Sequence, residues 1–271
     1  MTPRDLNSDT RAHFMSTMGF SHDMDDNRAT GWAAMGPYLR TGDRWPGVAA
    51  LLTFADVLIG QLASLRTAPR ISVTSDLWVR VLRPVPDDGQ IRMTAELLKS
   101  GRTMTVGETQ FFSTSGDLLA MSTGTFLASP RPVDEVPDGV SDRVWRPDPE
   151  GVAPTLVEQV GLRVLAPGRA EIVLRPDLVN ATESLQGGLV ALLGEVAAVS
   201  AATEATGQPH VVHDLQVRYL AAARIGPFRT SVALHGDGPS PLVRVEVRDP
   251  GRENRLASLI MADTRPDPGT G

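Results

Sequence analysis

Two apolar segments of this chain each end at a carboxylate that could do chemistry. Asp56 follows the apolar run of residues 46–55, and Glu195 follows a similar run over residues 186–194. An ionised carboxylate in apolar surroundings is costly unless it has a partner or a function. Glycine lies near the start of both segments, and the two copies lie about half the chain apart, so the sequence indicates one fold written twice.

The elements that carry these acids are predicted to be helices. Apolar residues recur with helical spacing over residues 45–66, and residues 187–205 are mostly small and apolar. Segments with strand-like composition, separated by turn signals, follow each helix. The predicted strands are 72–82, 90–99, 103–113 and 118–128 in the first half, and 170–174, 210–220, 228–234, 242–248 and 255–262 in the second.

The predicted domain organisation is two similar repeats joined by a proline-rich linker. Residues 1–30 are polar and charged and are interpreted as an N-terminal extension. Residues 31–129 form the first repeat and residues 155–265 the second. Residues 130–154 contain six prolines among acids and glycines, which is typical of a linker, and residues 266–271 form a tail.

The repeat is also visible as letters. The pentapeptide at 76–80, Asp-Leu-Trp-Val-Arg, matches the pentapeptide at 214–218, Asp-Leu-Gln-Val-Arg, at four of five positions. The match is short, but the helix and the acid precede it at similar distances in both halves. The two helices can be aligned in two registers, and only one of these registers places Asp56 opposite Glu195.

Composition limits the possible functions. The chain has 271 residues, a net charge of −6 and a pI near 5.4, which argues against broad binding to nucleic acid or anionic membranes. It has no cysteine, so disulfides, thiolate catalysis and cysteine metal sites are excluded. The N-terminal residues lack an apolar signal core, and we expect a cytoplasmic protein with no membrane partner.

The second acidic helix resembles that of the hotdog thioesterases of the phenylacetic-acid-pathway type. That family has an Asn, then His-Gly-Gly at the helix start, then Asp or Glu eight residues after the first glycine. Asn180, Gly187 and Glu195 match this order, and Gln186 stands in place of the His. The resemblance implies an α+β double hotdog, in which two long helices are each wrapped by an antiparallel sheet and the two sheets join.

The first half departs further from the family pattern. Thr41 stands at the Asn position, and Val48 replaces the first glycine. The resemblance nevertheless covers roughly residues 30–130 and 165–265. The family spacing favours the helix alignment that places Val48 opposite Gly187 and the two acids opposite each other.

The resemblance implies hydrolysis of an acyl-CoA thioester by a carboxylate, which acts as base or nucleophile. A helix N-terminus has free backbone N–H groups that can polarise a carbonyl, and Gly187 and Gly188 allow close approach. Eight residues of helix rise about 12 Å, so Glu195 cannot reach a carbonyl held at Gly187 on its own helix. The acid must therefore come from the other repeat.

The predicted working site combines Asn180, Gln186 and Gly187 with Asp56. The opposite site would combine Thr41, Val48 and Glu195, and it looks degenerate. Arg102, in a predicted turn, could meet the phosphates of coenzyme A or could be an ordinary turn residue.

Two other functions remain open. A hotdog hydratase or dehydratase would need a catalytic His, and no His lies near either helix start. A non-catalytic acyl-CoA-binding module would fit the missing His and the altered first half. We expect no metal and no redox cofactor, an acyl thioester as partner, and a homo-oligomer, such as a dimer of double hotdogs. The acyl group is not predicted.

Overall fold

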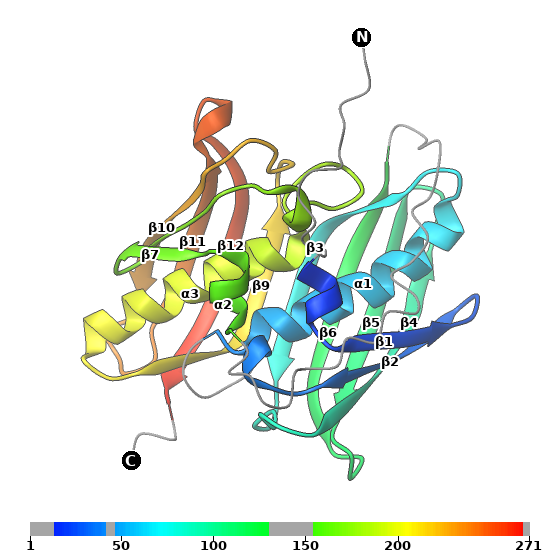
Figure 1. Cartoon of the computed structure of the whole chain (residues 1–271), viewed down its shortest axis with the longest axis horizontal. Coiled ribbons are helices and arrows are strands. Elements are labelled where there is room, and N and C mark those ends of the chain that lie inside the picture. The colour runs from blue at the N-terminus through cyan, green and yellow to red at the C-terminus, as the bar shows by residue number, and fades with distance from the viewer. Residues whose placement is uncertain (1–13, 42–46, 130–153, 268–271) are drawn as a thin grey trace.

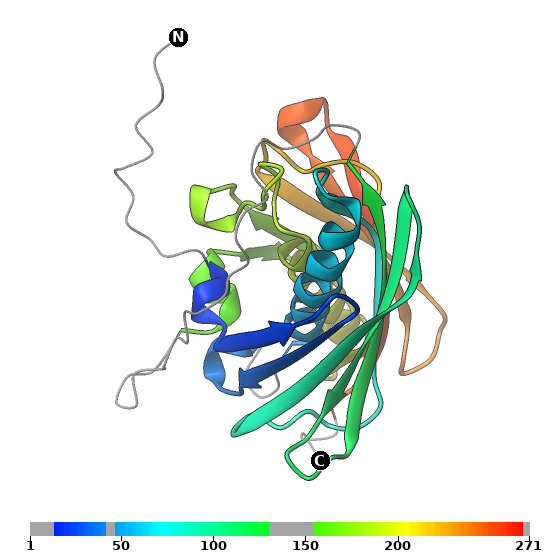
Figure 2. The same cartoon turned by 90° about the vertical axis from the view of Figure 1, so that its right-hand side faces the viewer.

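A single antiparallel sheet of 12 strands carries two long helices in the computed structural model, which describes residues 14–41, 47–129 and 154–267 (Figure 1). The helices are α1 (Val48–Thr67) and α3 (Gly187–Thr206). Figure 2 shows both on the same side of the curved sheet. This is the predicted α+β arrangement.

Each half contributes six strands to the sheet. The strand order is β1-β2-β4-β5-β6-β3-β9-β12-β11-β10-β8-β7, so the halves meet at β3 and β9. The first half contributes β1 (Phe20–Met24), β2 (Arg28–Ala34), β3 (Ser72–Val81), β4 (Gln90–Ser100), β5 (Met104–Phe112) and β6 (Leu118–Ala128). The second half contributes β7 (Arg163–Ala166), β8 (Arg169–Ile172), β9 (His210–Tyr219), β10 (Phe228–His235), β11 (Leu242–Asp249) and β12 (Arg255–Pro266).

The repeated pentapeptides form the junction between the halves. β3 and β9 pair antiparallel, with Asp76 opposite Arg218 and Arg80 opposite Asp214. Both opposed pairs are ion pairs, at 3.4 and 3.3 Å. The predicted joining of the two sheets is therefore made by the segments that repeat in sequence, and it pairs two strand edges that would otherwise be exposed.

Both long helices are apolar on almost every face because sheet and partner helix surround them. By length and composition alone, both helices could cross a membrane. However, 67% of the most apolar 18-residue stretch of α1, and 72% of that of α3, is buried inside the protein. Gly188 lies where the helices touch, and a Cβ built on it would be 1.8 Å from Thr53 Oγ1. The first turn of α3 is thereby held against α1.

The N-terminal boundary of the first repeat was predicted too late. Residues 20–24 and 28–34 form β1 and β2, and β2 pairs with β4. Phe14 and Met18 are buried in the core. The part of the predicted extension from residue 14 onward therefore belongs to the repeat, because its few apolar residues pack although the segment as a whole is polar.

Three other features, the end of the last strand, the strand β7 and the linker, also bear on the predicted organisation. β12 continues to Pro266, so the tail begins later than the predicted strand end at 262. β7 was not predicted, since its four residues are all exposed and lack alternation. The linker at 130–154 lies almost entirely outside the described residues.

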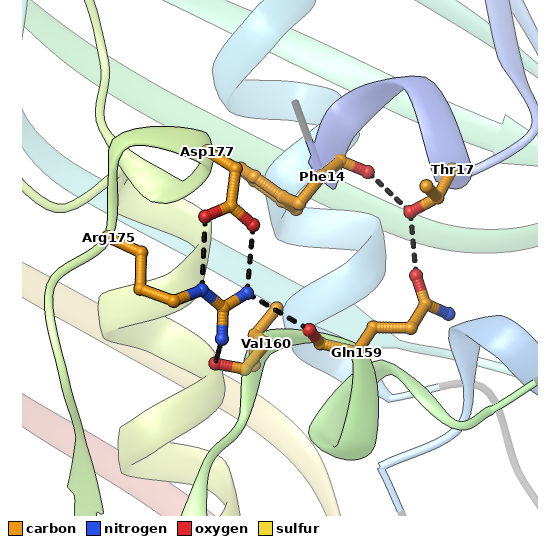
Figure 3. Close-up of polar contacts among 6 residues, drawn as sticks. All are labelled: Phe14, Thr17, Gln159, Val160, Arg175 and Asp177. Carbon is orange, nitrogen blue, oxygen red and sulfur yellow. Dashed lines mark hydrogen bonds and ion pairs between the residues drawn. The ribbon is translucent and has the colours of Figure 1, made fainter. Parts of the chain in front are cut away.

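Short helices on the open side of α1 and α3 connect the halves. They are η1 (Phe14–Thr17), η2 (Pro37–Leu39), α2 (Leu156–Val160) and η3 (Pro176–Leu178), while η4 (Pro250–Arg252) lies in the turn before β12. The Thr17 hydroxyl lies 2.6 Å from the side-chain oxygen of Gln159 (Figure 3). Arg175 donates to the carbonyls of Gln159 and Val160 at the end of α2 and holds Asp177 through two bonds.

Candidate active site

Asp56 and the start of α3 meet across the junction of the two repeats. Asp56 lies in the third turn of α1, and Gly187 is the first residue of α3. A Cβ built on Gly187 would lie only 2.9 Å from Asp56 Oδ2. The structure thus brings the acid of one repeat to the helix N-terminus of the other, as predicted.

Two side chains hold the Asp56 carboxylate. The Thr74 hydroxyl donates to Oδ1 at 2.7 Å, and Gln186 Nε2 donates to Oδ2 at 3.2 Å. Gln186 is also the N-cap of α3, because its Oε1 accepts from Leu189 N at 3.2 Å. Burial raises the pKa of Asp56 to about 6, although the bond from Thr74 acts in the opposite direction.

Tyr219, the last residue of β9, completes this site. Its hydroxyl donates to the carbonyl of Gly187 at 2.8 Å. Asp56, Thr74, Gly187 and Tyr219 are partly exposed as residues, whereas Gln186 and Gly188 are buried. We call the set Asp56, Thr74, Gln186, Gly187, Gly188 and Tyr219 the Asp56 site.

The equivalent site in the other direction is closed by its own acid. Glu195 Oε1 accepts from Val48 N at 3.0 Å, and Oε2 accepts from Ala49 N at 2.7 Å. The Thr41 hydroxyl lies 3.4 Å from Oε1. We call the set Thr41, Gly47, Val48, Ala49 and Glu195 the Glu195 site.

The members of this second site are deeply buried. Glu195, Val48 and Ala49 are 3%, 4% and 0% exposed. Burial raises the pKa of Glu195 to about 7, against the lowering effect of the bonds from Ala49 and Val48. The Glu195 carboxylate thus occupies the first two amides of α1, and the degeneracy of this second site stays a prediction.

The Glu195 site shows where an anion binds at these helix starts. Val48 and Ala49 are the first two residues of α1, as Gly187 and Gly188 are of α3. Within the described part of the chain, no acceptor bonds the amides of Gly187 and Gly188. N–H groups without an acceptor at a helix start can bind an anion. Gly187 is partly exposed and Gly188 is buried.

The polar members of the Asp56 site have apolar or small equivalents at the Glu195 site. When the repeats are aligned on the pentapeptides, Thr74 corresponds to Val212, and Tyr219 to Val81. When they are aligned on the helix starts, Gln186 corresponds to Gly47, which has no side-chain cap. Only the Asp56 site thus has both an acid held by polar partners and open amides.

Asn180 and Arg102 make no hydrogen bond with the described residues of either site. Asn180 Oδ1 accepts bonds from Thr182 and Ser184, so its side chain organises the turn before α3. Arg102 is exposed and its carbonyl binds Arg70, beyond the far end of α1. From Asp56 to Thr67 alone α1 rises about 17 Å, so Arg102 does not reach the Asp56 carboxylate.

Thr74 and Tyr219 are the two site residues that the sequence analysis missed. Both lie on the strands that carry the repeated pentapeptides, at either side of the matching letters. A residue-by-residue alignment of the two strands would have shown a polar residue against Val in each case. Among the residues that the structure describes, no cluster of His, Cys, Asp or Glu could hold a metal ion.

Several solved structures share this architecture. The TesB protein of Mycobacterium avium subs. paratuberculosis is 16% identical, with a TM-score of 0.63 over 94% of this chain and 98% of that chain. The 12:0-ACP thioesterase of Umbellularia californica is 12% identical, with a TM-score of 0.61 over 89% and 94%. An acyl-ACP thioesterase of Bacteroides thetaiotaomicron is 11% identical, with a TM-score of 0.59 over 89% and 100%. At these identities the likeness shows the fold.

The family comparison extends this result to the sequence. Residues 9–128 match the model of the family described as acyl-CoA thioesterase C-terminal domain. No curated protein matches the chain. The chain therefore has the double hotdog fold, and its first half is similar in sequence to the acyl-CoA thioesterase C-terminal domain family, over less than half of the chain. The finer likeness to the phenylacetic-acid-pathway type stays a prediction.

Proposed function

We propose that this chain hydrolyses an acyl thioester at the Asp56 site, with Asp56 as general base. The observation that carries the proposal is the meeting of the Asp56 carboxylate with the start of α3, where the amides of Gly187 and Gly188 have no acceptor among the described residues. A pKa of about 6 leaves Asp56 ionised at neutral pH. Because this pKa lies near the working pH, the carboxylate can accept a proton efficiently.

The proposed reaction needs only groups at this site and water. The thioester oxygen accepts from the Gly187 and Gly188 amides, and Asp56 takes a proton from a water molecule. The water oxygen bonds to the carbonyl carbon, and the amides stabilise the oxyanion that forms. The carbon–sulfur bond then breaks, and Asp56 returns the proton to the thiolate that leaves. Thr74 and Gln186 keep the carboxylate in place throughout.

The substrate is proposed to be an acyl-CoA, as the family that matches residues 9–128 is named for acyl-CoA. Two of the similar structures are named as acyl carrier protein thioesterases, so acyl carrier protein substrates belong in the same assay. A panel of short, medium, long and aromatic acyl-CoA substrates, followed by release of free thiol, would identify the acyl group.

The same panel tests the function itself. We expect the wild-type protein to release thiol and the Asp56→Asn variant to lose about 100-fold or more in kcat, the usual effect of losing a general base. Binding of acyl-CoA without any thiol release would instead indicate a binding module. Addition of water to an enoyl-CoA would indicate a hydratase.

A single-turnover reaction in 18O-labelled water tests for the nucleophilic route in which water opens an anhydride at the Asp56 carbonyl. With Asp56 as base, the product acid carries the label after one turnover. If Asp56 attacks the thioester and forms an anhydride that water opens at the Asp56 carbonyl, the label appears in the protein, and the general-base proposal is wrong.

A further inference from the structure

Tyr219 bonds to the same peptide unit that supplies one of the open amides. Its hydroxyl donates to the carbonyl oxygen of Gly187 at 2.8 Å. That carbonyl and the N–H of Gly188 belong to one planar peptide group. A Cβ built on Gly187 would lie 3.2 Å from the Tyr219 hydroxyl and 2.9 Å from Asp56 Oδ2, so the hydroxyl lies beside the proposed reaction centre.

A hydrogen bond at one end of a peptide group affects the other end. Electron density drawn toward the carbonyl oxygen leaves the N–H more positive, and connected hydrogen bonds strengthen one another in this way. The bond also fixes the plane of the peptide, and therefore the direction in which the Gly188 N–H points. Both effects favour an anion at that N–H.

The Glu195 site indicates that this particular amide matters. The residue equivalent to Gly188 is Ala49, whose N–H makes the shorter of the two bonds to the Glu195 carboxylate, 2.7 Å against 3.0 Å. The residue equivalent to Tyr219 is Val81, which has no hydroxyl. The tyrosine is therefore present only at the site whose amides are open.

Tyr219 is suited to donate and not to titrate. Burial, together with the nearby Asp56 carboxylate, raises the pKa of Tyr219 well above its usual value. The hydroxyl accordingly stays protonated over the pH range in which the protein would work.

We propose that Tyr219 is a positioning residue that strengthens and orients the Gly188 N–H as a donor to the oxyanion of the reaction. The proposal rests on thioester hydrolysis at the Asp56 site. It predicts an effect that appears mainly in the transition state, when the negative charge on the oxygen is largest.

The chain offers a matched control because it contains only two tyrosines. Tyr38 also donates its hydroxyl to a backbone carbonyl, that of Ala34, and it lies in η2, outside the set defined as the Asp56 site. Tyr219→Phe should lower kcat by about 5- to 50-fold with KM changed less than about twofold. Tyr38→Phe should leave both constants unchanged. An unaltered kcat in Tyr219→Phe, or equal losses in the two variants, would overturn the proposal.

A spectroscopic measurement keeps the test independent of turnover and of small losses in stability. The Asp56→Asn protein, with and without Tyr219→Phe, is saturated with the best acyl-CoA substrate labelled with 13C at the carbonyl. The infrared band of the bound carbonyl should shift to lower frequency, and the shift should be smaller without the hydroxyl. Equal shifts would contradict the role of Tyr219 while leaving hydrolysis intact. A wild-type protein that releases no thiol would contradict both proposals.

Discussion

Asp56 and Glu195 occupy equivalent positions in the two helices and differ by one methylene. The longer side chain reaches the amides of the opposite helix and closes that site. The shorter one is held by Thr74 and Gln186 and leaves the amides open. Side-chain length and the choice of polar partners therefore decide which of the two sites can bind a thioester.

The first prediction concerns a variant in which Asp56 is given the longer side chain of Glu195. Asp56→Glu should let the carboxylate bond to the Gly187 and Gly188 amides, as Glu195 bonds to those of α1. We expect kcat to fall about 100-fold or more, since the oxyanion donors are then occupied. The melting temperature should not fall, because the new cap satisfies two amides. Wild-type kcat in this variant, measured by thiol release, would contradict the account.

The second prediction concerns pH. The base must be ionised, so kcat/KM should rise with pH and level off above about 6, the pKa of Asp56. The bond from Thr74 lowers this pKa, and its loss in Thr74→Val should raise it. The acid limb of the pH–rate profile should therefore move to higher pH in the variant. A limb that stays in place or moves to lower pH would rule out this role of Thr74.

At the level of single residues, the sequence identified the two acids and the helix start at Gly187, and it placed Gln186 in the site without predicting that it caps the helix. It could not show that Glu195 binds backbone amides, because that contact depends on how closely the two helices pack. It also gave Asn180 a role by resemblance, which stays a prediction; Asn180 Oδ1 accepts bonds within the turn at 180–184.

The contact between α1 and α3 positions both sites. Gly188 is in the first turn of α3, and its lack of a side chain lets Thr53 of α1 approach. A larger residue there would push apart the two elements that supply the acid and the amides.

The third prediction tests this contact. Gly188→Ala would place a Cβ 1.8 Å from Thr53 Oγ1, so the helices must move apart. We expect a loss of about 1–3 kcal/mol in the free energy of unfolding, together with a loss of activity. Gly238→Ala is the control, because a Cβ there meets nothing within 4 Å. Equal stability of the two variants, measured by denaturant unfolding, would show that the contact is not tight.

Most elements could be predicted because their signals are local. β3 to β6 and α3 were predicted within one or two residues of their bounds, since alternation and turn residues mark them. β1 and β2 were missed because they form a polar hairpin at the edge of the sheet, and its pairing with β4 is a tertiary effect.

The whole molecule is one unit, although its sequence repeats. The halves share the β3–β9 ladder and the α1–α3 contact, and the Asp56 site takes residues from both. The fourth prediction is therefore a single cooperative transition in calorimetry, with equal calorimetric and van't Hoff enthalpies. Two separated transitions would show that the repeats fold as independent domains. Association into a larger homo-oligomer stays a prediction, which light scattering would test.

The central claim is that each chain has one working site, assembled from both repeats around Asp56. The most direct test compares thiol release by Asp56→Asn and Glu195→Gln under conditions where both variants are folded. The account predicts that the first variant loses activity and that the second keeps it. Equal losses, or a loss only in Glu195→Gln, would contradict the account.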